Sequence, residues 1–538
     1  MTDERTTRSG IPLRVAYGPD DVPLGAAESS RSRPGDPPFV RGAYPAMYRS
    51  RPWRIFQLSG YGNPEDERER ILFLLEQGET GFLMEHDRMT ADHLYNVDHP
   101  EVVARREDVG LSGAVILGAR DYETILNGIP IDHHYVHPGG AVVQHAPFAL
   151  SCYWTVAHRR GLDLSTLAGT GQSDFFLTYL GCIPKQQIPA TDGMRMNCDI
   201  IEFCAEQLPR WIPVSVAGYN AADTGLSGPE EVGAVMANAV AYLDAVLERG
   251  RLPIEQFAHS VGGINLRVSM DLFEEIAKLR AARKMWHDLL RSRYGIADER
   301  ALRLRIHVVT AGSAMTYQQP LNNVARGTLM ALASVLGGVQ SLGVSGYDEA
   351  LSIPSEHAHQ MSVRIQQILQ NETNLTSVAD PLGGSWFVES LTAEVEERAW
   401  EFFTEIERQG GFVPALDSGW LHEVAARHQA EELRAIDAGE QVIVGVNGFT
   451  EDVSPFEVGG FAGPDDVWDR AMARLADIRA TRGGRDVTRA LRELEGSCRS
   501  DRNIMPAMME AVGADATLGE IGDVFRDVFG DWKVPISF

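Results

Sequence analysis

Residues 41–62, RGAYPAMYRSRPWRIFQLSGYG, hold three tyrosines, one tryptophan and four arginines. Aromatic rings stack on flat ligands, and guanidinium groups pair with phosphates or carboxylates through two parallel hydrogen bonds. The segment has neither the alternation of a half-buried strand nor the apolar stripe of a helix. Its residue types therefore indicate a local binding segment for a polyanion.

The rest of the chain limits which polyanion this is. The 538 residues carry a formal net charge of −26, which repels nucleic-acid backbones. The five cysteines form no CxxC pair, which fits a reducing cytoplasm and argues against a disulfide framework or a structural zinc site. We see no signal-peptide core and no apolar run of about 18 residues, so we expect a cytoplasmic protein without a membrane span.

Compact catalytic motifs give little further guidance. The sequence has no GxxxxGK[ST] phosphate loop, no HExxH, no EF-hand loop and no GxSxG elbow. The glycines of GTGQS (169–173) and LGGVQ (336–340) fit turns better than a dinucleotide site. His133–His134 has no spaced carboxylate, which favours a structural role over metal ligation, and we expect no metal held by this chain.

The elements that must position functional residues alternate along the chain. Apolar runs of strand length lie at 81–86, 113–117, 167–171, 213–218, 304–309 and 338–345, and helical patterns at 64–78, 194–208, 230–250, 270–295 and 322–338. Such alternation implies βαβ units and a parallel sheet. Its length favours an α/β fold with a closed (β/α)8 TIM barrel, whose chemistry lies at the carboxyl ends of the strands.

Three regions are expected on this basis. Residues 1–55, rich in Pro, Gly, Ser and Arg, predict an extended N-terminal arm that continues into the segment described above. Residues 56–410 are the predicted catalytic barrel. Residues 411–538 predict a helical C-terminal region that packs on the barrel or on a partner.

The opening segment resembles the signature of the large chain of adenosylcobalamin-dependent acyl-CoA mutases, the methylmalonyl-CoA mutase family. Further motifs match in order: GTGQSDFFLTYL (169–180), VSVAGYN (214–220), EIAKLRAARKMW (275–286), QQPLNNVARG (318–327), LGGVQSL (336–342), GYDEALSIP (346–354), DPLGGSWFVE (380–389) and IVGVNGF (443–449). The resemblance implies a TIM barrel threaded by acyl-CoA, with adenosylcobalamin across its carboxyl-terminal mouth. It also implies a carbon-skeleton rearrangement, an isomerase reaction in which the thioester group migrates.

The same resemblance implies a partner. Family members bind cobalamin on a Rossmann-like domain marked by DxHxxG, and this chain contains no DxHxxG. We therefore expect a large, substrate-binding subunit that needs a small cobalamin-binding subunit. A large-subunit homodimer within a heterotetramer is a family expectation, and a G-protein chaperone is a further partner that the family allows.

Three residues of the opening segment match family contacts to the nucleotide end of coenzyme A: Tyr44, Met47 and Arg51. The alternative is a packed N-terminal hairpin whose arginines extend to solvent. Three others match positions at the reacting end. Gln172 matches a glutamine near the thioester, Tyr219 belongs to the motif beside it, and Gln340 matches a residue at the cobalamin face.

Four positions depart from methylmalonyl-CoA mutases. Leu58 stands where they have a tyrosine, and Cys182 where an arginine pairs with the free carboxylate of the substrate. Without that arginine, a buried substrate carboxylate would be unpaired and costly. Asn220 replaces a histidine that donates to the thioester carbonyl. Glu85 stands where these enzymes have a small apolar residue and where 2-hydroxyisobutyryl-CoA mutases have an aspartate that accepts the substrate hydroxyl.

These departures predict a substrate class. We expect a short hydroxylated or branched acyl-CoA without a free carboxylate, of the 2-hydroxyisobutyryl-CoA or 3-hydroxybutyryl-CoA type. Two alternatives stay open: an isobutyryl-CoA-type mutase, and a catalytically silent subunit that binds coenzyme A. A separate alternative for Glu85 is an ion pair with a neighbouring arginine or histidine such as His86.

Overall fold

The computed structural model describes residues 5–181, 187–451, 461 and 463–532. The chain forms two compact units. The first consists of Met1–Ile55, Val216–Ala241 and Gly262–Phe461, and the second of Phe56–Ser215, Tyr242–Val261 and Ala462–Phe538. Each unit contains its own five-stranded parallel sheet, and the units are described here one at a time.

The strands of the first unit's sheet all run parallel to one another. They lie in the order β3 (Arg54–Ile55), β12 (Ser341–Gly343), β11 (Arg305–Thr310), β10 (Gly263–Val268) and β9 (Val216–Ala217). β10 and β11 pair from Gly263 and Arg305 to Val268 and Thr310. Because the strands are parallel, the residues that follow β9, β10, β11 and β12 lie at one edge of this sheet, its carboxyl end.

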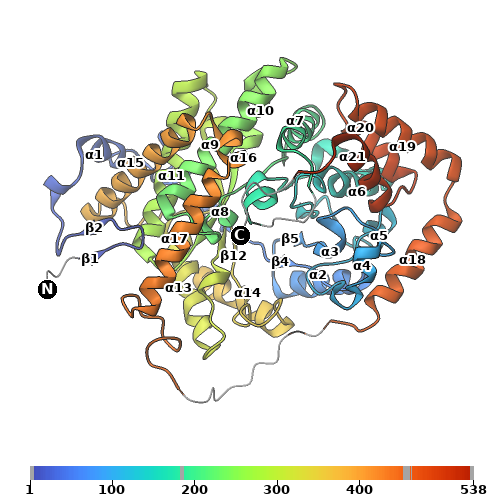
Figure 1. Ribbon diagram of the computed structural model, residues 1–538. Coiled ribbons are helices and arrows are strands. Elements are labelled where there is room, and N and C mark those ends of the chain that lie inside the picture. The colour runs from blue at the N-terminus through green and yellow to red at the C-terminus, as the bar shows by residue number, and fades with distance from the viewer. Residues whose placement is uncertain (1–4, 182–186, 452–460, 462, 533–538) are drawn as a thin grey trace. The chain divides into compact units, whose positions relative to one another are not determined.

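Helices and an N-terminal hairpin complete the first unit. The helices are α1 (Leu24–Ser30), α8 (Gly218–Asp223), the first part of α9 (Gly228–Arg249), α11 (Leu272–Tyr294), α12 (Glu299–Leu302), α13 (Asn322–Leu336), α14 (Glu356–Asn371), α15 (Trp386–Arg408), α16 (Phe412–Asp417) and α17 (Trp420–Asp437). α11 begins at Asp271, whose side chain accepts from the backbone of Glu274, and ends at Gly295 in the left-handed conformation. α11 and α15 lie side by side (Figure 1) and share a buried apolar cluster.

The N-terminal arm is anchored rather than loose. β1 (Arg5–Thr6) and β2 (Pro12–Leu13) form a short antiparallel hairpin. Between them, Ile11 is buried in the cluster formed by α11 and α15. The Ser9 hydroxyl donates to Glu274 of α11 at 2.6 Å. Residues 5–13 are therefore held by apolar burial and by hydrogen bonds to the start of α11.

The sheet of the second unit is also parallel and follows chain order. Its strands are β4 (Leu58–Ser59), β5 (Gly81–Met84), β6 (Tyr135–His137), β7 (Gly169–Thr170) and β8 (Trp211–Ile212). Its helices are α2 (Pro64–Gln77), α3 (Arg88–Ala91), α4 (Pro100–Val103), α5 (Ala119–Ile125), α6 (Ala146–Arg159), α7 (Ala190–Gln207), α10 (Ile254–Val261), α18 (Val467–Thr481), α19 (Gly484–Cys498), α20 (Met505–Gly513) and α21 (Leu518–Phe529). α2 has the predicted acidic first turn, with Pro64 at its first position and a capping box between Asn63 and Asp66.

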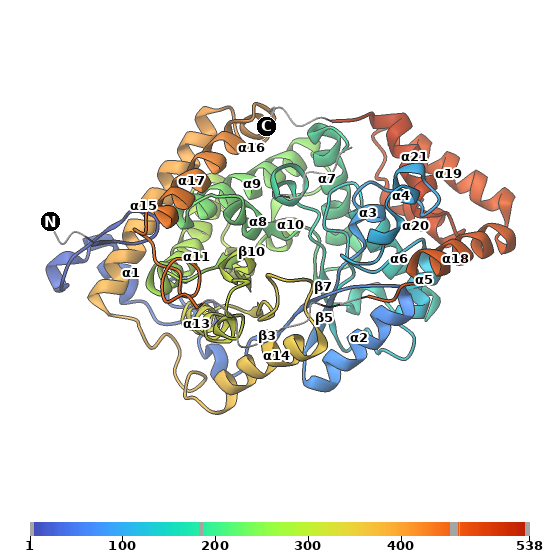
Figure 2. The ribbon, with the colours of Figure 1, turned by 60° about the horizontal axis from the view of Figure 1, so that its bottom comes forward.

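The chain's last helices pack within this second unit (Figure 2). α18 buries Val467, Ala471, Leu475 and Ile478 against a cluster from residues 95–117. The predicted strand at 113–117 is wrong for this reason: Val115 and Leu117 are apolar because they lie in this cluster, and within 113–117 only Ala114 forms a bridge, to His86. The predicted C-terminal region 411–538 also divides, since α16 and α17 belong to the first unit and α18–α21 to the second.

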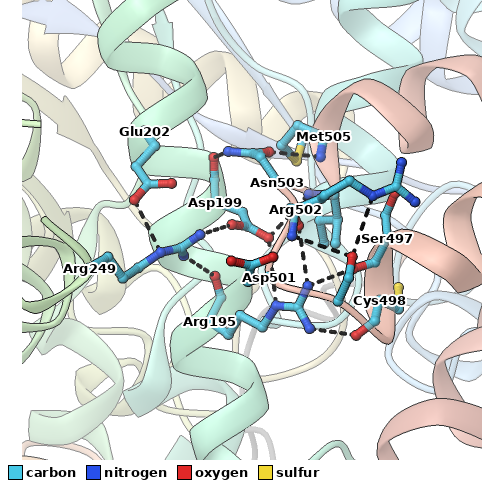
Figure 3. Close-up of polar contacts among 12 residues, drawn as sticks. Arg195, Asp199, Glu202, Arg249, Ser497, Cys498, Asp501, Arg502, Asn503 and Met505 are labelled. Atoms are coloured by element: carbon cyan, nitrogen blue, oxygen red, sulfur yellow. Dashed lines mark hydrogen bonds and ion pairs between the residues drawn. The ribbon is translucent and has the colours of Figure 1, made fainter. Parts of the chain in front are cut away.

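A buried ion-pair network joins α7, the end of α9 and the chain between α19 and α20 (Figure 3). The carboxylate of Asp199, which is fully buried, pairs with Arg249 and accepts from the Ile504 backbone at 3.2 Å. Arg195, one turn before Asp199, donates to the Ser497 carbonyl at 2.7 Å. These contacts fix the end of α19 and the start of α20 to the body of the second unit.

Several strands were not anticipated, among them β6 and β10. β10 alternates Ile264, Leu266 and Val268 with the polar Asn265 and Arg267 and so forms no continuous apolar run. None of the helices formed by the described residues combines the length and apolar character that a membrane crossing requires.

Candidate functional site

The segment before β3 lies at the amino end of the first unit's sheet. Part of its unusual composition serves packing. Tyr48 is buried and donates to the Val339 carbonyl at 2.7 Å, while Trp53 donates to Gln366 at 3.1 Å. Arg41 donates to Asp380 at 2.7 Å. These aromatic and basic residues therefore hold the segment in place and are not available to a ligand.

The predicted nucleotide contacts differ from these packing residues. Tyr44 is 40% exposed, and Arg51 is exposed and makes no side-chain hydrogen bond or ion pair within the described residues. Met47 is buried beneath them with a φ of 38°, a conformation that a non-glycine residue adopts only when its surroundings impose it. An exposed ring and a free guanidinium on a rigid turn are what a nucleotide-binding strip requires.

Gln340 lies at this same amino end. Its carbonyl accepts from the Arg54 backbone at 3.0 Å, and its side chain accepts from the backbone of Ile306 at 2.8 Å and donates to Gly338 at 2.9 Å. Both polar ends of the amide are thus used by the fold. Gln340 directly precedes β12, and its place at the cobalamin face stays a prediction.

Tyr219 and Asn220 lie at the carboxyl end of the same sheet, in the first turn of α8 directly after β9. The Tyr219 hydroxyl accepts from the Gly312 backbone, two residues past β11, at 3.2 Å. Burial first, and then the charge of Asp223, raise the pKa of Tyr219, so the phenol stays protonated. The Asn220 side chain is half-buried and makes no hydrogen bond within the described residues, which leaves its amide able to donate to a ligand.

Glu349 belongs to this carboxyl end, and the sequence analysis assigned it no role. The Glu349 side chain is exposed; its partial desolvation, and then the charges of Asp348 and Asp223, raise its pKa. The Glu349 side chain approaches Gly312, the residue that bonds Tyr219. It lies in the matched motif GYDEALSIP, which is the signal that could have identified it.

In the second unit, three predicted residues lie at the carboxyl edge of its sheet. Leu58 is in β4 and is 48% exposed, Glu85 directly follows β5, and Gln172 comes two residues after β7. The Glu85 backbone donates to the Ser59 carbonyl at 2.7 Å. Gly60 permits this approach, since a Cβ there would overlap the Glu85 carbonyl. Gln172 is half-buried and makes no side-chain hydrogen bond within the described residues.

The Glu85 carboxylate is half-buried and makes no hydrogen bond or ion pair within the described residues. Burial raises the pKa of Glu85 to about 7, Arg88 lowers it in part, and Asp92 raises it. Arg88 itself donates to Asp92 at 3.1 Å. Glu85 is therefore an acid with a perturbed pKa at a strand end, which is typical of a functional position.

The alternative pairing of Glu85 with His86 does not form in the structure. His86 contacts His145, with 3.3 Å between ring nitrogens, and its other nitrogen lies 3.2 Å from the Tyr122 hydroxyl. Burial lowers the pKa of His86 well below its usual value and that of His145 to about 3, so both rings are neutral. This buried triad, which sequence spacing did not reveal, supports the chain directly behind Glu85.

Cys182 lies outside the described residues, so its predicted place in the substrate pocket stays a prediction.

Comparisons with known proteins agree with these motifs. The family model for methylmalonyl-CoA mutase matches residues 6–531. The chain is 34% identical over 502 residues to the 2-hydroxyisobutanoyl-CoA mutase large subunit of Aquincola tertiaricarbonis, covering 93% of this chain and 88% of that protein. It is 35% identical over 542 residues to the methylmalonyl-CoA mutase of Cereibacter sphaeroides, covering 99% and 73%. It is 32% identical to the methylmalonyl-CoA mutase large subunit of Porphyromonas gingivalis, covering 100% and 73%.

The chain belongs to the methylmalonyl-CoA mutase family. The predicted enzyme class, an adenosylcobalamin-dependent acyl-CoA mutase, is confirmed by this membership. The residues present fit one side of that cofactor. The printed sequence contains no DxHxxG motif, and no group of three metal-ligating side chains occurs within the described residues. Hydrogen-bonding groups without internal partners, such as the Asn220 amide, do occur at the carboxyl end.

Proposed function

We propose that this chain is the substrate-binding subunit of an adenosylcobalamin-dependent mutase that acts on a short hydroxylated acyl-CoA without a free carboxylate. Substrates of the 2-hydroxyisobutyryl-CoA and 3-hydroxybutyryl-CoA type fit best. The observation that carries the proposal is the Glu85 carboxylate, which follows β5, the strand paired with that of Leu58; it is half-buried and has no hydrogen-bond or ion-pair partner in the described part of the chain. A substrate hydroxyl that donates to it would supply the missing partner.

The charges around Glu85 disfavour a dicarboxylic substrate. Glu85 and Asp92 are two carboxyl groups whose pKa values burial raises, to about 7 and about 6. A free carboxylate on the acyl group would add a third negative charge, and only Arg88 among these neighbours opposes it. The similarity to a protein named 2-hydroxyisobutanoyl-CoA mutase supports the same substrate class.

The roles of the other residues follow their positions. When bound, adenosylcobalamin supplies the radical chemistry that starts the rearrangement. Tyr44 and Arg51 bind the coenzyme A nucleotide at the amino end, with Met47 as their support. Tyr219 and Asn220 hold the thioester carbonyl at the carboxyl end. Gln172 and Leu58 orient the acyl group.

We also propose the (β/α)8 barrel and the small cobalamin-binding subunit. Support for the barrel is the order of strand segments: 54–59 supplies β3 and β4, 211–217 supplies β8 and β9, and six further segments lie in chain order between and after them. Support for the partner is the absence of DxHxxG from these residues together with the similarity to a protein named a large subunit.

A substrate panel tests the function. The chain is combined with a DxHxxG-containing small subunit from the same source and adenosylcobalamin, and assayed with 3-hydroxybutyryl-, 2-hydroxyisobutyryl-, isobutyryl- and methylmalonyl-CoA. Hydroxyacyl-CoAs should give the highest kcat/KM, and Glu85→Ala should remove that preference, whereas the exposed Glu76→Gln should not. Faster turnover of methylmalonyl-CoA would refute the substrate class, and preference for isobutyryl-CoA would assign the alternative. Acyl-CoA binding without turnover of any substrate would indicate a silent subunit.

A further inference from the structure

A chain of hydrogen bonds lies directly behind Glu85 in the second unit. Successive side chains of an extended segment point to opposite faces, so the ring of His86 points away from the Glu85 carboxylate. Nδ1 of His86 lies 3.3 Å from Nε2 of His145, at the start of α6, and Nε2 of His86 lies 3.2 Å from the hydroxyl of Tyr122 in α5. That hydroxyl donates to the Pro138 carbonyl. Since α5 and α6 lie side by side (Figure 2), the buried triad joins the end of β5 to both helices.

The last member of the triad fixes the direction of every hydrogen bond in it. The Tyr122 hydroxyl has one proton and gives it to the Pro138 carbonyl, which can only accept. Both histidine rings are neutral, because burial lowers the pKa of each. Tyr122 therefore accepts from Nε2–H of His86, whose bare Nδ1 in turn accepts from Nε2–H of His145. The ring of His86 is thus held at both nitrogens in one orientation.

Two glycines enclose His86 closely. A Cβ at Gly139 would lie 2.4 Å from Nε2 of His86, and a Cβ at Gly113 would lie 2.2 Å from the His86 carbonyl carbon. The two glycines have φ values of 82° and 149°, so glycine suits both the backbone conformation and the close approach. The ring of His86 and the backbone that carries it therefore have little room to move.

The backbone around Glu85 lies at the end of a strand. β5 ends at Met84, and Glu85 makes two backbone hydrogen bonds, donating to the Ser59 carbonyl at 2.7 Å and accepting from Ala114 at 2.9 Å. His86 then forms an isolated bridge with Ala114. Segments at the end of a strand open more readily than segments inside a ladder. The side-chain bonds of the triad therefore hold this segment at the point where the regular ladder of the sheet stops.

We infer that His86 and Tyr122 are positioning residues for Glu85, and that through Glu85 they set the preference for a hydroxylated acyl group, an inference that rests on the proposed function. A substrate hydroxyl bonds the Glu85 carboxylate only within about 3 Å, so a displacement of about 1 Å loses the contact. An isobutyryl group has no hydroxyl and does not sense that displacement. An apolar side chain at position 86 would fill the core without fixing one orientation, whereas a fully hydrogen-bonded ring does fix one.

Tyr122→Phe and the matched control Tyr153→Phe test the inference. Both tyrosines are fully buried in the second unit, but the Tyr153 hydroxyl has no hydrogen-bond partner within the described residues, whereas the Tyr122 hydroxyl has two. Each variant is combined with the small subunit and adenosylcobalamin, and kcat/KM is measured for 3-hydroxybutyryl-CoA and for isobutyryl-CoA. The same pair of measurements in a Glu85→Gln chain shows whether the effect passes through Glu85. His86→Leu removes both bonds of the ring, and His86→Gln keeps an amide that can donate to Tyr122.

Tyr122→Phe should lower kcat/KM for 3-hydroxybutyryl-CoA by about tenfold or more and leave kcat/KM for isobutyryl-CoA within about twofold. Tyr153→Phe should change neither value. In the Glu85→Gln chain the effect of Tyr122→Phe should vanish, and His86→Gln should keep more of the substrate preference than His86→Leu. An equal loss for both substrates would overturn the inference, because the triad would then support the fold alone. An unchanged preference in both Tyr122→Phe and His86→Leu would overturn it as well.

Crystal structures without substrate separate this inference from the proposed function. The Glu85 carboxylate should be displaced by about 1 Å in Tyr122→Phe and unmoved in Tyr153→Phe. If wild type turns over no hydroxyacyl-CoA but the carboxylate moves in Tyr122→Phe, the proposed function fails and the positioning role stands. If wild type prefers hydroxyacyl-CoA and the carboxylate stays in place in both Tyr122→Phe and His86→Leu, the positioning role fails and the proposed function stands.

Discussion

The Tyr219 hydroxyl accepts a hydrogen bond from the Gly312 backbone at 3.2 Å, and this contact joins the ends of β9 and β11. Both residues follow their strands directly, so the bond closes two non-adjacent strand ends over β10. Since the nitrogen of Gly312 is the donor, the phenol proton is left to point elsewhere. Tyr219 thus serves both to shape the carboxyl end and to offer a donor there.

Tyr219→Phe should therefore lower kcat/KM on the order of a hundredfold, because it removes a fixed donor and leaves the Gly312 N–H without its acceptor. Acyl-CoA affinity should change little, since the residues predicted to bind the nucleotide, Tyr44 and Arg51, precede β3 at the other end of the sheet. Steady-state kinetics of the reconstituted enzyme measure both values. Tyr347→Phe removes a hydroxyl that contacts His357 at 3.0 Å and serves as the control. Equal kinetics for Tyr219→Phe and wild type would contradict the role.

The pKa of Glu85, raised to about 7 by burial, predicts a pH-dependent preference. The carboxylate that accepts a substrate hydroxyl is populated above pH 7, so kcat/KM for hydroxyacyl-CoAs should rise through that pH. Isobutyryl-CoA, which has no hydroxyl, should show no such rise. In Glu85→Gln the rise should vanish. A rise of equal size for isobutyryl-CoA would show that another group titrates.

Glu85 also affects stability with a defined sign. Its pKa in the folded chain lies above its ordinary value of 4.5, so folding takes up a proton between pH 4.5 and 7. The contribution of Glu85 to the free energy of unfolding is therefore fully present below pH 4.5 and is lost as the pH rises through 7. Urea denaturation should find Glu85→Gln more stable than wild type at pH 8, with the gain shrinking toward pH 4.5. A gain that is independent of pH would contradict the shift.

Arg51 is predicted to bind a phosphate of coenzyme A. Arg51→Ala should raise KM for the acyl-CoA by about tenfold or more, because a charge-assisted hydrogen bond is lost. The same variant should not change KM for the corresponding acyl-pantetheine, which has no nucleotide. Arg485→Ala, an exposed arginine of α19, is the matched control. An equal KM increase for both thioesters would show that Arg51 acts on the segment's structure instead.

Particular residues show which features of the fold and of the candidate site could be predicted from the sequence. Motif order gave the family and the alternation of helices and strands. A motif match does not say at which end of its strand a residue lies, so the role of Gln340 stays a prediction. Glu85 was predicted as an acid of the substrate pocket. Local sequence could not decide whether Glu85 pairs with His86, because His86 instead contacts His145, which lies far along the chain.

Long-range packing explains the remaining differences. Residues 113–117 are as apolar as a strand, yet their partner is α18, some 350 residues later in the chain. The division of the C-terminal region depends on contacts such as Arg195 with Ser497, which no local pattern encodes. The exposure of Tyr44 and Arg51, in contrast to the burial of Tyr48 and Trp53, likewise depends on distant partners.

The Asp199–Arg249 pair predicts how the last helices are held. Asp199 is fully buried, and burial raises its pKa while Arg249 lowers it. In Arg249→Ala the Asp199 carboxylate keeps only the more distant Arg195 and Arg251, each at 4.0 Å, as ion-pair partners within the described residues. The substitution should therefore lower the free energy of unfolding by about 3 kcal/mol. The control Arg479→Ala breaks an exposed pair with Asp98 at 2.5 Å and should cost below about 1 kcal/mol.

The pH dependence separates lost charge pairing from lost packing. Without Arg249 the folded-state pKa of Asp199 rises further, so the variant's stability falls as the pH increases from acid to neutral values. Urea midpoints at pH 5 and pH 8 should therefore show a larger deficit for Arg249→Ala at pH 8. Arg479→Ala should show a small deficit at both. If Arg249→Ala loses the same stability at pH 5 and at pH 8, Arg249 stabilises the fold through packing and not through its charge on Asp199.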